Sequence, residues 1–255
     1  MPVVTALYRY PVKGLSPEAL GRAALLPDQS IPGDRQFAIA HGTTSFDPAA
    51  PKYLPKAYFL MLMRNGALAA LRTAFDASTG VLTIRQPDGG SVSGDLNDPA
   101  GRAVVEDFMS AYLGAEVRGR PKVVTAPGHM FSDVAAKVVS LINLASVRDI
   151  EARAGKKVDP LRFRGNVHFE SPAPWVEFDW IGRELQIGSV RFEVIKRIVR
   201  CAATEVDPDN GARDLGIPSL LQREYGHTDT GVYARVVKAG DIAVGDALSV
   251  AARLV

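Results

Sequence analysis

The stretch ELQIGSVRFEVIKRIVRC, residues 184–201, decides the fold class of this chain. It holds two runs of alternating apolar residues on either side of Gly188: Glu184–Ile187, with Leu185 and Ile187, and Val190–Ile195, with Val, Phe and Ile. Runs of this kind that are bounded by glycine are typical of neighbouring β-strands. The second run keeps its β-type pattern almost to Cys201, so we expect a strand to lead directly into the loop that carries this cysteine.

Further strand-like runs lie on both sides of this stretch. They are Val3–Arg9, Gln36–Ala40, Gly80–Arg85, Val167–Glu170, Val232–Val237 and Ala247–Ala252. Glycine and other turn-forming residues separate them. The pattern predicts a mainly β fold with a few packed helices, of the α+β type.

Three helices are expected between the strands. The first begins near Pro99, because a first turn has no use for the N–H that proline lacks, and it ends at Gly114. The second covers about Leu144–Ala154, and the third follows Pro218 and ends before Gly226. The segment 54–75 fits a helix and a strand equally well.

The chain of 255 residues is long enough for one large domain or two closely packed ones. We expect a smaller β-rich domain over residues 1–115 and a second domain over residues 116–255. No stretch of flexible composition separates them, so the two should pack closely.

Composition excludes several classes of function. Apolar residues make up 47% and charged residues 23%, and the formal net charge is +2. This charge is too small to favour nucleic acid as a partner. No apolar run reaches the roughly 18 residues of a membrane span, and the first 20 residues lack the apolar core of a signal peptide. We therefore expect a cytoplasmic protein.

Cys201 is the only cysteine. A single thiol makes no intramolecular disulfide and no multi-cysteine metal cage, but it can serve as a nucleophile, a sulfur carrier or a metal ligand. The neighbouring Arg200 favours the thiolate, which is the reactive form. The alternative is a buried structural thiol, because free cysteine is often buried.

Basic residues accompany glycine at three places. Lys13 precedes Gly14, Arg35 follows Gly33-Asp34, and Arg164 precedes Gly165. Glycine lets a ligand approach the backbone, and Lys and Arg form charge-assisted hydrogen bonds with phosphate. Any one of these segments taken alone is also compatible with surface charge beside an ordinary turn.

Taken in order, these segments resemble the MOSC family, named for the C-terminal domain of molybdenum cofactor sulfurase. The resemblance rests on Tyr10-Pro-Val-Lys-Gly14, Gly33-Asp-Arg35, Arg164-Gly-Asn166, Cys201 with Val206-Asp-Pro208, Gly211-Ala-Arg-Asp214, Gly231-Val-Tyr-Ala234 and Gly240-Asp-Ile-Ala-Val-Gly-Asp246. It extends over nearly the whole chain. It implies a MOSC-type β-barrel preceded by a smaller N-terminal β-rich domain.

The resemblance also implies a molybdenum cofactor (Mo-molybdopterin) held between the two domains. By position in the motifs, the metal ligand is Cys201, the phosphate-binding residues are Lys13 and Arg35, the residues near the pterin are Arg164 and Asn166, and an acidic residue beside the metal is Asp207. Gly14 stands where the family usually has serine, and its backbone N–H can replace the serine hydroxyl as a donor. Asn210 stands in place of the usual threonine.

The histidines of the chain do not indicate a second metal site. The four histidines, His41, His129, His168 and His227, show no metal-ligand spacing. His168 follows Arg164-Gly-Asn166 closely enough to lie near Cys201. One cysteine cannot hold an iron–sulfur cluster, so a reductase of this type would take electrons from a separate ferredoxin- or cytochrome-type protein.

Three functions remain open. The first is a molybdenum-cofactor oxidoreductase that reduces N-hydroxylated or N-oxide-type small molecules with electrons from separate proteins. The second is a sulfur carrier or sulfurtransferase with a persulfide on Cys201. The third is a non-catalytic module that binds an anion or a cofactor.

Overall fold

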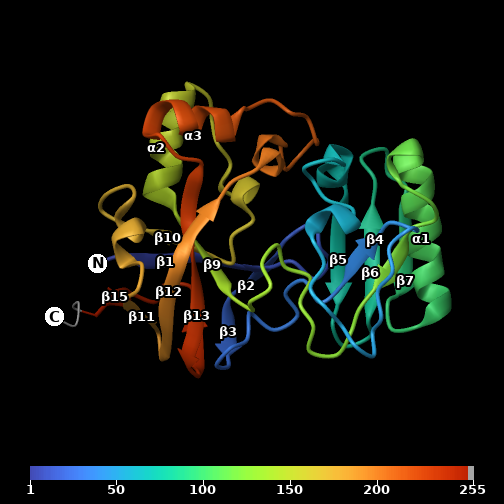
Figure 1. Cartoon of the computed structure of the whole chain (residues 1–255), viewed down its shortest axis with the longest axis horizontal. Coiled ribbons are helices and arrows are strands. Elements are labelled where there is room, and N and C mark those ends of the chain that lie inside the picture. Colours follow the sequence, from blue (N-terminus) through green and yellow to red (C-terminus); the bar gives the residue numbers. More distant parts are fainter. Residues whose placement is uncertain (252–255) are drawn as a thin grey trace.

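The structure, a computed structural model, describes residues 1–251 and consists mainly of β-strands with three α-helices (Figure 1). The strands are β1 (Val3–Arg9), β2 (Glu18–Leu20), β3 (Arg22–Leu25), β4 (Ala38–Ala40), β5 (Arg72–Asp76), β6 (Val81–Arg85), β7 (Ser91–Asp95), β8 (Lys122–Val124), β9 (Val139–Asn143), β10 (Val167–Glu170), β11 (Glu184–Ile187), β12 (Val190–Val199), β13 (Asp229–Lys238), β14 (Gly240–Ala243) and β15 (Leu248–Val250). The helices are α1 (Pro99–Leu113), α2 (Leu144–Ala154) and α3 (Ile217–Tyr225). The predicted fold class is confirmed.

One curled sheet of eight strands forms the larger body. Its order is β15-β11-β12-β13-β9-β10-β1-β2, and only β9 and β10 run parallel. The backbone N–H of Leu248 donates to the carbonyl of Pro2 at 2.8 Å, and that of Val4 donates to Asp246 at 2.9 Å. These bonds join β1 to the segment that leads into β15, so the sheet curls back towards its own first strands. Its inner face forms a core that includes Phe169 and Phe192, both fully buried.

Helices α2 and α3 pack together on this body (Figure 1). Helix α2 connects the parallel strands β9 and β10, which need a crossover of this length. Asn143 caps its first turn, and Gly155 ends it in the left-handed conformation at φ 62°. Strand β12 ends at Val199, two residues before Cys201.

The smaller body contains the three-stranded sheet β5-β6-β7, with α1 packed against it, and the pair β4-β8. Its core includes Phe37, Leu71 and Met109. Strands β1, β2 and β3 belong to the larger body, because β1 pairs with β10 and β3 pairs with β14. Between β1 and β2 the chain already contributes Val12 and Leu15 to the core of the smaller body. The predicted boundary at residue 115 stays a prediction.

The predicted elements agree with those observed. The three helices end within one residue of the expected positions, and each expected strand coincides with an observed one. Ala252, the last residue of the expected strand Ala247–Ala252, lies outside the described residues. The undecided segment 54–75 forms two short 3₁₀ turns followed by most of β5. No helix within residues 1–251 combines the length and the apolar character that crossing a bilayer requires.

Candidate functional site

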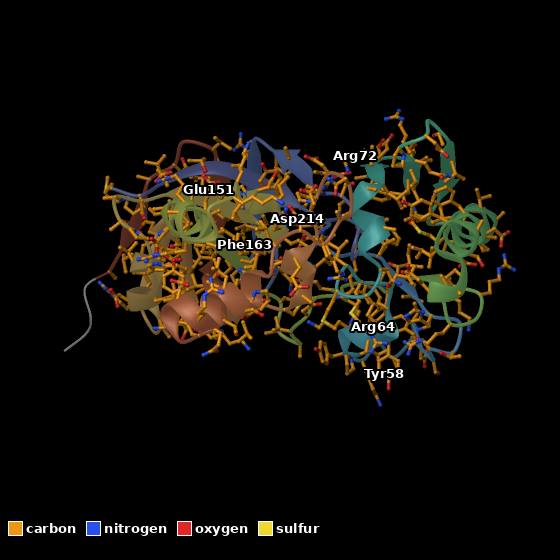
Figure 2. All side chains as sticks on the ribbon, turned by 90° about the horizontal axis from the view of Figure 1, so that it is seen from above. Tyr58, Arg64, Arg72, Glu151, Phe163 and Asp214 are labelled. Atoms are coloured by element: carbon orange, nitrogen blue, oxygen red, sulfur yellow. The ribbon has the colours of Figure 1, made fainter. Side chains whose placement is uncertain are left out.

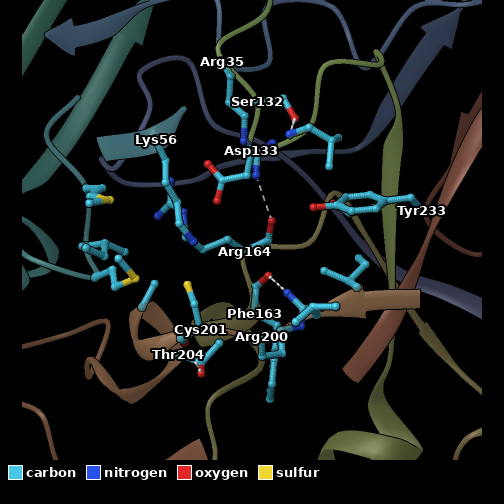
Figure 3. Close-up of a pocket in the computed structure, with 18 of the residues that line it drawn as sticks. Arg35, Lys56, Ser132, Asp133, Phe163, Arg164, Arg200, Cys201, Thr204 and Tyr233 are labelled. Atoms are coloured by element: carbon cyan, nitrogen blue, oxygen red, sulfur yellow. Dashed lines mark hydrogen bonds between the residues drawn. The ribbon is translucent and has the colours of Figure 1, made fainter. Parts of the chain in front are cut away.

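A cavity of about 390 Å³ lies where the two bodies meet. Figure 2 shows Phe163 and Asp214 on the larger body and Arg64 and Arg72 on the smaller one. Six of the seven residues predicted for the site line this cavity, namely Lys13, Gly14, Arg35, Arg164, Asn166 and Cys201. Their sequence separation reaches 188 positions, so the fold brings together residues that the sequence alone cannot place side by side (Figure 3).

The aromatic ring of Tyr10 contacts the guanidinium groups of two arginines that line the cavity, Arg35 and Arg164. The ring is fully buried, and the guanidinium carbons of Arg164 and Arg35 lie 4.2 and 4.9 Å from its centroid. Burial raises the pKa of Tyr10 to about 12, so the ring stays neutral and attracts both cations through its face. Arg35 also donates to the carbonyl of Arg164 at 3.1 Å. Aromatic contact and hydrogen bonding together fix both guanidinium groups.

Both arginines adopt an unusual backbone conformation. Arg35 and Arg164 each have φ 50°, a left-handed value that costs energy for any residue with a side chain. Asp34 beside Arg35 compensates, because its carboxylate pairs with the Arg35 guanidinium and accepts from the N–H of Tyr10 at 2.8 Å. Burial lowers the pKa of Arg164 to about 10, so this residue stays charged at neutral pH. The cavity thus holds two rigid, desolvated cations.

Lys13 supplies a third buried cation. Its ammonium group donates to the carbonyl of Phe131 at 3.1 Å and forms an ion pair with Asp133. Burial lowers the pKa of Lys13 more than the attraction of Asp133 raises it. Desolvation by itself would raise the pKa of Asp133, but Lys13 and other nearby cations lower it overall. Asp133 is therefore ionised, and sequence reasoning did not single it out.

Cys201 stands at the opposite wall of the cavity, where β12 ends (Figure 3). Its carbonyl accepts from the N–H and the hydroxyl of Thr204, both at 3.0 Å, which fixes the turn after it. The buried Arg200 donates to the carbonyls of Thr230 and Phe163, both at 2.9 Å. The half-buried thiol is thereby presented to the cavity on a firmly held loop.

This loop is also fastened to the smaller body. Arg213 donates to the carbonyl of Ala202 at 2.9 Å and to that of Met63 at 2.7 Å. Arg72 reaches from the start of β5 to the carboxylate of Asp209 at 2.9 Å. These bonds cross from one body to the other, so the position of the thiol depends on how the bodies are packed together.

Lys56 lies across from Cys201, on the 3₁₀ turn Lys56–Tyr58 of the smaller body (Figure 3). Burial lowers the pKa of Lys56, but the charge of Cys201 and a hydrogen bond between the two side chains outweigh this and raise it overall. The segment 54–75 contains no recognisable turn motif at Lys56, so no local signal pointed to this residue.

Asn166 connects three strands from the edge of the cavity. Its side-chain oxygen accepts from the hydroxyl of Ser140 at 2.8 Å, and its amide nitrogen donates to the carbonyl of Tyr8 at 3.2 Å. Gly14 has φ 85°, and an added Cβ would come within 3.2 Å of the carbonyl oxygen of Leu60. Glycine suits this position because the conformation is strained for every residue with a side chain.

Asp207 is the predicted site residue that does not line the cavity. Its carboxylate accepts from the buried Arg162 at 3.1 Å and from the N–H groups of Asp209 and Asn210 at 2.9 and 3.1 Å. Arg162 in turn lines the cavity. Asp207 therefore shapes the loop after Cys201 and orients a cavity arginine. Within residues 1–251, no group of three or more His, Cys, Asp or Glu side chains is arranged to hold a metal ion.

His168 packs edge-on against Tyr8, with 4.9 Å between the ring centroids, and does not line the cavity of Cys201. Burial, with a smaller effect of Arg200, lowers the pKa of His168 to about 4. Folding then favours the neutral ring, so its stabilising effect is complete above pH 6.5 and is lost as the pH falls towards 4. Because one pKa unit corresponds to about 1.4 kcal/mol, we expect a loss of up to about 3 kcal/mol.

Urea unfolding of the wild type and of His168→Gln between pH 7 and pH 4.5 measures this loss. The free energy of unfolding of the wild type should fall more steeply than that of the variant. Parallel curves would contradict the assignment, since the remaining titrating groups are the same in both proteins.

Two family models together match nearly the whole chain. The MOSC N-terminal beta barrel domain matches residues 1–121, and the MOSC domain matches residues 126–249. Together they include every residue that lines the cavity. The chain belongs to the MOSC family. The resemblance inferred from its motifs is confirmed, and the cavity of this MOSC protein lies between parts that the two models cover.

Two mitochondrial proteins are similar in sequence to part of this chain. Mitochondrial amidoxime reducing component 2 of Bos taurus is 32% identical over 120 residues, which are 42% of this chain and 35% of that protein. Mitochondrial amidoxime-reducing component 1 of Homo sapiens is 30% identical over 118 residues, 42% of this chain and 34% of that protein. The alignments span about a third of the length of these relatives. Among solved structures, the YUAD protein from Bacillus subtilis covers 98% of this chain and 96% of its own, at 12% identity and a TM-score of 0.46.

Proposed function

We propose that this protein binds a molybdenum cofactor in the cavity between its two bodies and reduces N-hydroxylated or N-oxide-type small molecules. The observation that carries the proposal is that the Cys201 thiol, the buried Lys13 and the partly buried Arg35 and Arg164 line one cavity. A soft thiolate suits a thiophilic metal, and buried cations suit a phosphate. The amidoxime-reducing names of two relatives support the substrate class.

The residues of the cavity fit the cofactor in size and donor chemistry. A volume of about 390 Å³ lies within the usual range for ligand sites. Lys13, Arg35 and Arg164 would hold the phosphate, and Cys201 would be the protein ligand of the metal. The metal centre, when bound, supplies the electron transfer that breaks the N–O bond. Asp207 positions the Cys201 loop and Arg162, and we assign it this positioning role in place of the predicted contact with the metal.

The proposed reduction requires electrons and protons as well as the substrate. Cleavage of an N–O bond to give an amine and water consumes two electrons and two protons. The electrons come from a separate ferredoxin- or cytochrome-type protein, because the chain has a single cysteine and cannot hold an iron–sulfur cluster of its own. Lys56 lines the cavity beside Cys201, and its ammonium group would donate a hydrogen bond to the oxygen at the site of cleavage, while the protons would come from solvent.

Metal and pterin analysis tests this function. The protein is purified from a host that makes the cofactor, and molybdenum and the fluorescent oxidised pterin are quantified per chain. Near-stoichiometric amounts of both, with benzamidoxime reduction by a chemical electron donor, support the proposal. A protein that carries neither metal nor pterin under these conditions contradicts it.

Sulfur transfer is the second candidate, and the contact between Lys56 and Cys201 favours it. The Cys201 thiolate would attack the outer sulfur of a donor persulfide, the donor S–S bond would break, and the donor thiolate would leave. Mass spectrometry after incubation with a low-molecular-weight persulfide distinguishes the candidates. A metal-free protein that gains one sulfur atom on Cys201 points to this alternative.

A further inference from the structure

Asp133 carries a negative charge among the basic residues that line the cavity. The basic residues that line the cavity are Lys13, Arg35, Lys56, Arg162, Arg164, Lys196, Arg197 and Arg200, and the one acidic residue is Asp133. Buried cations are costly unless an anion accompanies them. In the structure, the Asp133 carboxylate supplies this negative charge by pairing with Lys13.

The segment that carries Asp133 is irregular and is anchored at its two ends. Residues 132–138 belong to no helix or strand, and the side chain of Asp133 is 49% exposed. The hydroxyl of Tyr53 donates to the carbonyl of Asp133 at 3.0 Å on the exposed surface. The segment is anchored before Asp133, where the N–H of Phe131 donates to the carbonyl of Arg35 at 2.9 Å, and after it, where the hydroxyl of Ser30 donates to the carbonyl of the buried Val138 at 3.0 Å. Asp133 lies between these anchors, so its side chain can turn outward without disturbing a strand.

We propose that Asp133 is an internal counter-ion that occupies the anion site formed by Lys13, Arg35 and Arg164 and must leave when a phosphate group binds there. Two anions around the same lysine repel each other, and because Lys13 is only 8% exposed, water screens this repulsion only in part. The positions of Arg35 and Arg164 are fixed by Tyr10, so these cations stay in place for the incoming phosphate. Phosphate binding is thereby coupled to the release of residues 132–138.

The inference rests on the proposed function only in its choice of anion. Its test uses inorganic phosphate and the full chain from a host unable to make the cofactor. Asp133→Asn keeps the shape and an oxygen acceptor for Lys13 but removes the charge. We expect calorimetry at low ionic strength to show phosphate binding at least about tenfold tighter in this variant than in the wild type.

Asp107→Asn is the matched control. Asp107 is exposed on α1 and pairs with Arg120 away from the cavity, so this variant changes the net charge equally. It should bind phosphate like the wild type. Hydrogen exchange gives an independent measurement: phosphate should increase exchange in residues 132–138 of the wild type, because these residues are released.

The possible outcomes separate this inference from the proposed function. Equal or weaker phosphate binding by Asp133→Asn, or unchanged exchange in residues 132–138, overturns the counter-ion role and leaves the cofactor proposal standing. If neither the wild type nor Asp133→Asn binds phosphate, the anion site itself is overturned. The proposed binding of the cofactor phosphate by Lys13, Arg35 and Arg164 is then overturned as well. Tighter binding by Asp133→Asn that Arg35→Ala abolishes supports both.

Discussion

Replacing Cys201 by alanine is expected to reduce reductase activity to the background of the assay while the protein stays folded. The change removes the thiol proposed to bind the metal but few packing atoms, because the side chain is only half-buried. The free energy of unfolding should change by no more than about 1 kcal/mol. Much of the pterin should remain, since Lys13, Arg35 and Arg164 hold the phosphate independently of the thiol.

The measurements are the rate of amidoxime reduction, the midpoint of thermal unfolding and the pterin content per chain. Asp107→Ala is the control, because Asp107 lies exposed on α1 and pairs with Arg120 away from the cavity. It should keep both activity and pterin. Wild-type activity in Cys201→Ala would exclude the thiol from the reaction.

Replacing Arg35 by alanine is expected to deplete the cofactor. A charge-assisted contact between arginine and phosphate contributes about 1.5–3 kcal/mol, so its loss weakens binding roughly 10- to 150-fold. The variant also leaves the buried carboxylate of Asp34 without its partner and removes a bond to the carbonyl of Arg164. For this reason thermal unfolding must be followed alongside pterin content.

Arg35→Lys separates loss of binding from loss of folding. It keeps the positive charge beside Asp34 but cannot form the two parallel hydrogen bonds of a guanidinium. Pterin content should therefore be intermediate between those of the wild type and Arg35→Ala. Equal pterin content in all three proteins would show that the phosphate lies elsewhere.

Local sequence was sufficient for most of the secondary structure. Asp98 caps α1 by accepting from the N–H of Gly101, and Gly155 and Gly226 end α2 and α3 in the left-handed conformation. These signals act within one turn of the chain, so they can be identified without the fold. Strand β9 was not predicted, although all five of its residues are buried, because a short apolar run without flanking turn residues has no distinctive period.

The sequence by itself determined the family, the mainly β fold and six residues of the cavity, because ordered motifs and local turn signals are properties of the chain. The tertiary structure decided which neighbours these residues have. Lys56 beside Cys201, Asp133 on Lys13 and the stacking of Arg164 on Tyr10 join residues 120 to 154 positions apart. Such contacts depend on strand register and on the packing of two bodies, and no local propensity encodes either.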